Sequence, residues 1–379
     1  MAPDTIFIPY RAMREKSDGP GGLVAAAMSG GVDSSVAAAL LRAEGIEVVG
    51  VTLNLFALPK ALCASDELRS CCGAGARRDA GAVAAVLGIP FYVADFRRTF
   101  ARAVIEDFIA EYRRGRTPNP CLRCNRFVKF GPLLRRAARL GADRVATGHY
   151  ARLETDRASG RRLLKKGADP DKDQSYFLYP LSQNELARTL FPVGHLRKAD
   201  VRMLAERFGL PVARKPESQE ICFVPDDDYV RFLRERIPEA FVPGPIVDRA
   251  GRTIGRHAGV LNFTIGQRKG MGIAAPRPLY VIAIEPATNA IVAGPNEELF
   301  RARLRVSDVN WVAVAGLSGP LRAAVKVRYR HLEAPAVLHP DERGGIMVEF
   351  DKPQRAVTPG QAAVFYDGDI VLGGGTIEG

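Results

Sequence analysis

Cysteine is absent from the last 157 residues of this 379-residue chain, because all six cysteines lie between Cys63 and Cys222. A disulfide framework would spread its cysteines through the whole chain, so this distribution excludes one. Uninterrupted apolar runs of about 18 residues are also absent, which excludes a membrane-spanning helix. The first twenty residues combine one short apolar run with several charges, which fits neither a signal peptide nor a transit peptide. We therefore expect a cytoplasmic protein without a membrane partner.

Acidic residues are missing from one long stretch, although the chain carries 42 of them against 54 Lys and Arg, a formal net charge of +12. Between Arg113 and Arg139 there are nine basic residues and no acidic one. Such a basic block is typical of surfaces that bind the phosphates of a nucleic acid. A solvated helix face would have the same composition, and charge alone does not separate the two interpretations.

Apolar runs alternate with helical patterns in the first half of the chain. Buried strands are predicted over Leu23–Met28, Ile46–Leu53, Ile89–Val93 and Arg144–Thr147. Helices are predicted between them, over 77–87, 101–113 and 131–140, and shorter ones over 184–190, 197–208 and 226–236. Strands that alternate with helices indicate an α/β fold with a parallel sheet.

Only short β-type segments with Gly, Pro and Asp turns follow residue 276, the first two being Leu279–Glu285 and Ala290–Ala293. This pattern predicts a small C-terminal β-barrel or sandwich. The domains expected from the sequence are an extension over 1–20, an α/β domain over 21–195, a small central domain over 196–275 that carries Cys222, and a β-barrel over 276–379.

Seven residues, Ser29-Gly30-Gly31-Val32-Asp33-Ser34-Ser35, lie between the first predicted strand and a helix. The glycines let the backbone approach a ligand, and the free N–H groups of the following helix attract an anion. With hydroxyl donors from Ser29, Ser34 and Ser35, the segment predicts a phosphate-binding loop. It is not a Walker A loop, because no Gly-Lys dipeptide occurs in the chain. Without a lysine beside a γ-phosphate, transfer of the γ-phosphoryl group is not favoured.

Two cysteines form a Cys-x-x-Cys pair inside the basic block, at Cys121 and Cys124. Basic neighbours lower the pKa of a thiol and favour the reactive thiolate. No second Cys-x-x-Cys pair and no two histidines separated by three to five residues accompany them, so structural zinc is not favoured. Two interpretations remain. Either Cys124 and Cys222 form a redox pair that passes on a persulfide sulfur, or Cys121, Cys124 and Cys222 ligate a [4Fe–4S] cluster with one iron open for sulfide.

The Ser29–Ser35 string resembles the PP-loop of the ATP pyrophosphatases, which attack the α-phosphate of ATP and release pyrophosphate. Further strings follow in order through most of the chain. They are Gly115–Pro120 with Cys124-Asn125, Ala146–Tyr150, Lys172–Leu178, Leu190–Gly194, Ile221–Phe223, Thr264–Gly270, Val327–Arg330 and Thr358–Tyr366. Together these strings resemble the bacterial tRNA-specific 2-thiouridylases.

The resemblance implies an adenine nucleotide α-hydrolase-like fold and a reaction. ATP, with Mg²⁺, adenylates O2 of uridine 34 at the wobble position of a tRNA, pyrophosphate leaves, and sulfur then displaces AMP to give 2-thiouridine. The implied partners are the anticodon arm of the tRNA and a sulfur-donor protein, either a persulfide carrier or a cysteine desulfurase.

The resemblance also assigns roles to individual residues. The catalytic residues are Asp33, Cys124 as the nucleophile and Cys222 as the persulfide carrier. The ATP contacts are Ala27, Met28, Ser29, Gly30, Gly31, Val32, Asp33, Ser34, Leu53 and Gly148. The contacts to the target base are Asn119, Pro120 and Cys121, and those to the rest of the tRNA are His149, Lys172, Asp173, Gln174, Arg328, Tyr329 and Gln361. We also expect His149 and Tyr150 to offer flat faces on which a splayed nucleotide stacks.

One position departs from well-known members, which carry Asp where this chain has Cys121. In members with Cys-x-x-Cys the resemblance leans toward the [4Fe–4S] cluster, and the persulfide relay remains the alternative. Two other functions are also open. A PP-loop synthetase that acts on a small molecule would not need the basic block, and a non-catalytic RNA-binding protein would not need an intact PP-loop.

Overall fold

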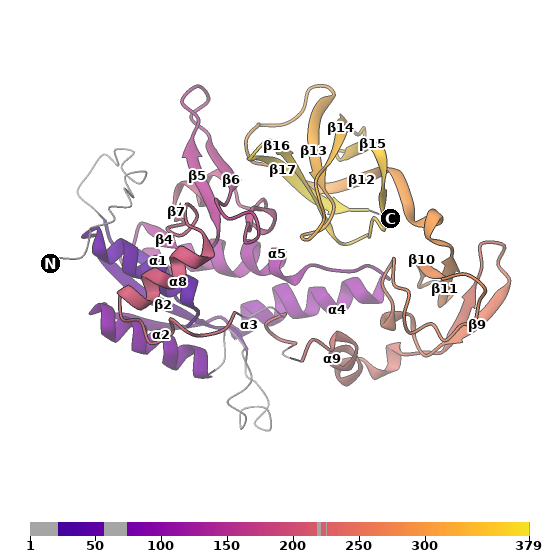
Figure 1. Cartoon of the computed structure of the whole chain (residues 1–379), viewed down its shortest axis with the longest axis horizontal. Coiled ribbons are helices and arrows are strands. Elements are labelled where there is room, and N and C mark those ends of the chain that lie inside the picture. The colour runs from indigo at the N-terminus through magenta and orange to yellow at the C-terminus, as the bar shows by residue number, and fades with distance from the viewer. Residues whose placement is uncertain (1–21, 57–73, 218–220, 225, 379) are drawn as a thin grey trace.

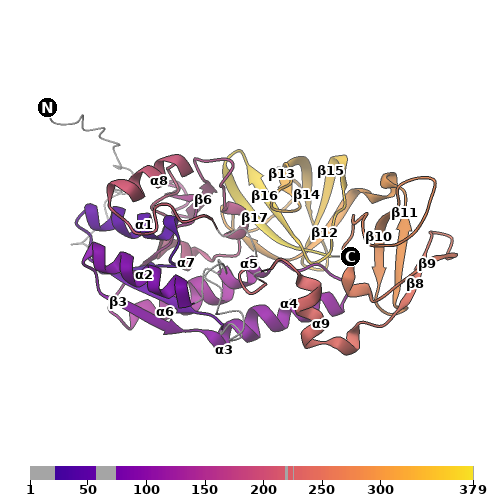
Figure 2. The same ribbon diagram turned by 60° about the horizontal axis from the view of Figure 1, so that its bottom comes forward.

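The computed structural model describes residues 22–56, 74–217, 221–224 and 226–378. The expected extension over 1–20 and the cysteines Cys63, Cys71 and Cys72 lie outside these ranges. Figures 1 and 2 show an α/β part at one end of the molecule and a small β part at the other, with a barrel packed between them. The small β part is called the central part below, because it comes from the middle of the sequence. Within the described ranges, none of the helices combines the length and apolarity needed to cross a bilayer.

A five-stranded sheet forms the centre of the α/β part, in the order β3-β2-β1-β4-β7 with every pair parallel. Its strands are β1 (Val24–Ala27), β2 (Val48–Asn54), β3 (Phe91–Asp95), β4 (Arg144–Ala146) and β7 (Thr189–Leu190). The predicted α/β class is confirmed. The apolar runs predict β1 and β2 because both faces of a parallel sheet are covered, so neighbouring residues are buried alike.

Helices cover both faces of this sheet. On one face Ala26 and Val24 pack with α1 (Val32–Ala43), α2 (Ala74–Leu87) and α8 (Lys198–Arg207). On the other face Ala25 packs with α6 (Gly131–Ala138) and with the helical segment after β3. Successive strand residues point to opposite faces, and this alternation produces the two cores.

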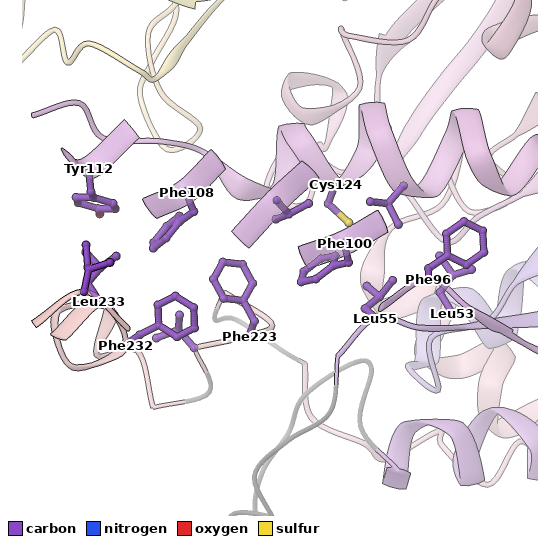
Figure 3. Close-up of a cluster of buried hydrophobic side chains, with 14 of the residues drawn as sticks. Leu53, Leu55, Phe96, Phe100, Phe108, Tyr112, Cys124, Phe223, Phe232 and Leu233 are labelled. Atoms are coloured by element: carbon purple, nitrogen blue, oxygen red, sulfur yellow. The ribbon is translucent and has the colours of Figure 1, made fainter. Parts of the chain in front are cut away.

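A long helical segment leaves the sheet and reaches the central part (Figure 1). It consists of α3 (Arg97–Phe100), a π-helical turn over 101–105 and α4 (Glu106–Arg113). Phe223, next to Cys222 in the sequence, packs its ring 5.7 Å from that of Phe100 and 5.4 Å from that of Phe108 (Figure 3). Edge-to-face contacts of this kind fix the short segment around Cys222 against the long helix.

The central part contains α9 (Tyr229–Arg236) and a four-stranded sheet in the order β10-β11-β8-β9. The strands are β8 (Gly244–Val247), β9 (Thr253–His257), β10 (Tyr280–Glu285) and β11 (Ala290–Gly294). The segments around 280–285 and 290–294 are strands as expected, but they pair with each other and with β8, not with the C-terminal strands. The prediction that they join the barrel is therefore wrong.

The C-terminal strands close into a barrel in the order β12-β15-β14-β13-β16-β17, with β12 also paired to β17. They are β12 (Phe300–Trp311), β13 (Leu321–Lys326), β14 (Ala334–Pro340), β15 (Ile346–Arg355), β16 (Ala362–Asp367) and β17 (Ile370–Ile377). A hairpin from the α/β part, β5 (Ala151–Thr155) and β6 (Arg162–Lys166), pairs with β17 through Lys165 and Ile370. This hairpin joins the barrel to the sheet that carries the phosphate loop.

Two short helices complete the architecture. α5 (Pro120–Cys124) carries both cysteines of the Cys-x-x-Cys pair and continues through a π-helical turn into α6. α7 (Gln183–Ala187) overlaps the helix predicted over 184–190, but it ends early because Thr189 and Leu190 form β7 and pair with β4.

Candidate active site

The phosphate loop lies after β1, at the carboxyl end of the parallel sheet. Gly30 has φ of +70°, and a Cβ there would lie 2.2 Å from the carbonyl oxygen of Ala76, so this position requires glycine. Gly31 is the N-cap of α1 and has no side chain to cap the helix, which leaves the first-turn N–H groups directed at a ligand. The loop therefore has the local geometry of an anion site.

The loop serines differ from the expectation. Ser35 is fully buried, and its hydroxyl donates to the carbonyl oxygen of Gly31 at 2.8 Å. Ser34 is also buried and donates to the same oxygen at 3.2 Å, while the backbone N–H of Ser29 donates to the Ser34 hydroxyl. Two of the three hydroxyls thus hold the shape of the loop. The expectation that Ser35 donates to a ligand is wrong.

Gly148 brings a second strand to the loop. It follows β4, and a Cβ at this position would lie 2.4 Å from the backbone nitrogen of Ser34. The sheet order changes direction between β1 and β4, and ligands of open α/β sheets bind in the crevice at such a point. Ala27 ends β1, and Leu53 is the last residue but one of β2 at the same edge, so the expected ATP contacts are brought together.

Asp33 is held by side chains from outside the loop. The Lys198 ammonium lies 2.7 and 2.9 Å from its two carboxylate oxygens, and the Tyr150 hydroxyl donates to one of them at 2.7 Å. Lys198 also pairs with Glu217 at 2.9 Å, and Glu217 pairs with Lys172 at 2.8 Å. Burial alone would raise the pKa of Glu217, but hydrogen bonds from the two lysines lower it to about 2.

The Tyr150 ring is not available to a nucleotide. The side chain is 2% exposed, and its hydroxyl is committed to Asp33. Burial raises the pKa of Tyr150 well above its ordinary value, and the neighbouring Asp33 charge adds to the rise. The prediction of a stacking face at Tyr150 is therefore wrong, and this residue positions Asp33 instead.

The segment that carries the Cys-x-x-Cys pair is held by the barrel. The Gln361 side-chain amide donates to the carbonyl oxygen of Thr117 at 2.9 Å, and the Thr117 N–H donates to that of Pro359 at 2.9 Å. The side-chain oxygen of Asn119 caps α5 by accepting from the N–H groups of Cys121 and Leu122. Prolines on both sides of Asn119 restrict the backbone further. The cysteine segment is thus anchored on the N-terminal side of Cys121.

The three cysteines differ in exposure. Cys121 is exposed, Cys124 is buried and Cys222 is partly buried. Figure 3 shows the Cys124 sulfur directed at Phe100, with Phe223 close by. Cys124 and Cys222 therefore border the same aromatic cluster, although about a hundred residues separate them in the sequence.

Comparisons with known proteins match the whole of this arrangement. Family models match residues 23–226 as a tRNA methyl transferase HUP domain, 230–295 as a tRNA methyl transferase PRC-barrel domain and 301–377 as an aminomethyltransferase β-barrel domain. The tRNA-specific 2-thiouridylase MnmA of Symbiobacterium thermophilum is 55% identical over 93% of this chain and 91% of its own. Those of Heliobacterium modesticaldum and Moorella thermoacetica are each 52% identical over 93% of this chain, and over 92% and 98% of their own. The chain belongs to the tRNA-specific 2-thiouridylase family.

The residues expected to contact the tRNA differ in how far they are buried and in what they contact. Tyr329 comes from the turn after β13, and its ring centroid lies 4.4 Å from that of Phe177. Burial raises the pKa of Tyr329, the charge of Asp173 adds to the rise, and the charge of Arg330 opposes it. Lys172 is half-exposed and pairs with Glu217.

Other members of the expected set support the protein backbone. Asp173 is buried and accepts from the N–H groups of Gly167 and Ser175, and Gln174 accepts from the N–H of Tyr150. His149 packs beside Phe130 and Phe191, and burial lowers its pKa well below 6.5, so the ring is neutral at pH 7. Direct tRNA contacts by these residues and by Arg328 and Gln361 stay predictions.

The [4Fe–4S] cluster, toward which the resemblance leans, has little support in this arrangement. In the part of the chain that the structure describes, no three His, Cys, Asp or Glu side chains are grouped to hold a metal ion. The aromatic rings next to Cys124 supply no ligands, and Cys121 and Cys124 differ in exposure. The cysteines as placed here do not fit a [4Fe–4S] cluster, and no step is derived through one.

Sequence patterns missed the ion pairs around Asp33. Lys198 and Glu217 carry no motif, and their meeting depends on how α8 packs on α1. Lys215 was missed in the same way, although its ammonium lies 2.9 Å from the Gly30 carbonyl oxygen and 2.5 Å from Asp79. The cap at Asn119 could have been found, because Asn before Pro is a common start of a helix.

Asn119 offers a prediction that separates the cap from base recognition. Asn119→Asp keeps the oxygen that caps α5 but loses the amide donor, whereas Asn119→Ala loses both. We expect the alanine variant to lose about 1 kcal/mol of stability and the aspartate variant to lose much less. Both should form 2-thiouridine slowly, as measured by nucleoside mass spectrometry beside thermal unfolding. An aspartate variant with full activity would contradict a role for the amide at the base.

Proposed function

We propose that the protein catalyses ATP-dependent 2-thiolation of uridine 34 in tRNA. The observation that carries the proposal is the continuous set of contacts between the phosphate loop and the cysteine segment. Asp33 accepts from the Tyr150 hydroxyl, and the Tyr150 N–H donates to the side chain of Gln174. The carbonyl oxygen of Gln174 accepts from the N–H of Phe177, and that of Phe177 accepts from Asn125, the residue after Cys124. The nucleotide and sulfur parts of the reaction therefore have adjoining places in one site.

The first half of the reaction uses the PP-loop. The N–H groups of α1 and the backbone of Gly30 and Gly31 would bind the phosphates of ATP. Asp33 would hold Mg²⁺, because this ion is usually bound through one or two carboxylates together with phosphate and water oxygens. That ion would neutralise the pyrophosphate as uridine O2 attacks the α-phosphate. The base must leave its stack to reach the site.

The second half uses Cys124 and Cys222. The outer sulfur of a persulfide on Cys222 attacks C2 of the adenylated uridine, and AMP leaves with the former O2. The Cys124 thiolate then attacks the Cys222 sulfur, which leaves 2-thiouridine and a Cys124–Cys222 disulfide that a thiol reductant reduces. A sulfur-donor protein would reload Cys222. We place this activity in the cytoplasm, where thiols are kept reduced.

The basic block would contribute to tRNA binding only in part. Arg113, Arg114, Arg116 and Arg123 already pair with carboxylates of Glu239, Glu111, Glu378 and Asp107. We expect the remaining basic side chains of the block to meet phosphates. The α/β domain over 21–195 stays part of the proposal, and we assign tRNA binding to the barrel of β12–β17, which begins at Phe300 and not at residue 276.

Pyrophosphate release tests the proposal against its alternatives. With ATP and Mg²⁺, we expect release only when a tRNA transcript bearing uridine 34 is added, and a transcript with cytidine 34 serves as the matched control. A small-molecule synthetase would not need the tRNA, and an RNA-binding module would release no pyrophosphate. Either of these results would replace the proposed function.

A further inference from the structure

Lys198 places a positive charge beside the phosphate loop Ser29–Ser35, which contains no Lys or Arg of its own. It is the first residue of α8, and its side chain is 12% exposed. Its ammonium spans both oxygens of Asp33 and also binds Glu217, while its backbone N–H donates to Asp169 at 2.9 Å. Both the backbone N–H and the ammonium of Lys198 are thus held in place beside the phosphate loop. A solvated surface lysine would have neither contact.

We propose that Lys198 binds the phosphates of ATP that leave as pyrophosphate, and that it exchanges Asp33 for them when the nucleotide enters. This inference rests on the proposed use of ATP and names the group that distinguishes the triphosphate from shorter nucleotides. In the nucleotide-free protein the ammonium neutralises Asp33. When Mg²⁺ takes the place of the ammonium at Asp33, the ammonium would stay beside the phosphates, with Glu217 still holding it.

Charge and geometry both favour this exchange. The Tyr150 hydroxyl holds one oxygen of Asp33, so the carboxylate stays in place when Lys198 leaves it. Asp33 is the second residue of α1, next to the N–H groups that point at the phosphates. An ammonium within 3 Å of that carboxylate reaches a phosphate in the same cradle by a side-chain rotation alone.

The test is nucleotide binding by calorimetry, with Mg·ATP and AMP as the probes. We expect Lys198→Gln to weaken ATP binding about tenfold to a hundredfold, the usual effect of losing a charged hydrogen bond, and to change AMP binding less than twofold. Lys198→Arg should recover most of the ATP affinity. Lys166→Gln is the matched control, because Lys166 is also partly buried and pairs with Glu333, but on β6. It should bind both nucleotides as the wild type does.

A second comparison separates phosphate binding from the neutralisation of Asp33. Asp33→Asn removes the charge that Lys198 balances, so a merely neutralising lysine would no longer matter in that background. We expect the double variant Asp33→Asn with Lys198→Gln to bind ATP a further tenfold more weakly than Asp33→Asn alone. Equal binding by these two variants, or equal loss of ATP and AMP in Lys198→Gln, would overturn the inference. Because thiolation is not the readout, a wild type that binds ATP but forms no 2-thiouridine would contradict only the proposed function.

Discussion

Gly148→Ala is expected to abolish ATP binding and with it both pyrophosphate release and thiolation. The added Cβ would lie 2.4 Å from the nitrogen and 2.8 Å from the Cα of Ser34, and 2.6 Å from the carbonyl carbon of Asp33. These are backbone atoms of the PP-loop, so no flexible side chain can move aside. The loop itself must shift, and misplacement by about 1 Å is enough to cost a hundredfold in rate.

A matched glycine shows whether the effect is local. Gly316 has no atom within 4 Å of the position that its Cβ would take, and its φ is not positive. Gly316→Ala should therefore bind ATP and release pyrophosphate as the wild type does. We expect Gly148→Ala to lose about 1–3 kcal/mol of stability through overpacking but to remain folded at 25 °C. If its ATP affinity, measured by calorimetry, stays within threefold of the wild type, the assignment of Gly148 to the nucleotide site is wrong.

Cys124→Ala and Cys222→Ala should uncouple the two halves of the reaction. Neither sulfur takes part in the attack of uridine O2 on ATP, so both variants should release tRNA-dependent pyrophosphate in a single turnover. Both should fail to produce free 2-thiouridine, a loss of at least a hundredfold measured by nucleoside mass spectrometry. Cys124 packs in the aromatic cluster, so thermal unfolding must accompany the assay to show that the alanine variant is folded.

Cys121→Ser separates the two chemical accounts of the cysteines. In the persulfide relay Cys121 carries no sulfur, and the serine variant should keep most of the activity. In the cluster account it is an iron ligand, and the variant should be inactive. Anaerobically purified wild-type protein that contains iron and absorbs near 400 nm, together with an inactive serine variant, would contradict the relay.

The sequence predicted those helices, strands and loops whose structure is determined by residues close together in the chain. The apolar runs of β1 and β2, the glycines before α1 and the helical period of α4 each act within one element. The Ser29–Ser35 loop was found for the same reason, because its glycines and helix start lie together in the sequence. The family resemblance then supplied candidate roles for residues that had no local signal.

Long-range pairing explains what was missed. β6 joins β17 about two hundred residues away, and β10 with β11 pairs with β8, which no turn signal reveals. The expected stacking face at Tyr150 failed because the ring is buried, and the sequence alone does not distinguish a buried tyrosine from an exposed one. The cation at Asp33 was missed because Lys198 follows it by 165 residues and meets it only through the packing of α8 on α1.

The central claim is tested most directly by the nucleosides of tRNA from a strain that lacks the gene. Mass spectrometry should show that 2-thiouridine and its derivatives are lost. The wild-type gene should restore them, and the Cys124→Ala gene should not. If 2-thiouridine persists at wild-type levels in the deletion strain, and no other thiolating enzyme in that strain accounts for it, the account is contradicted.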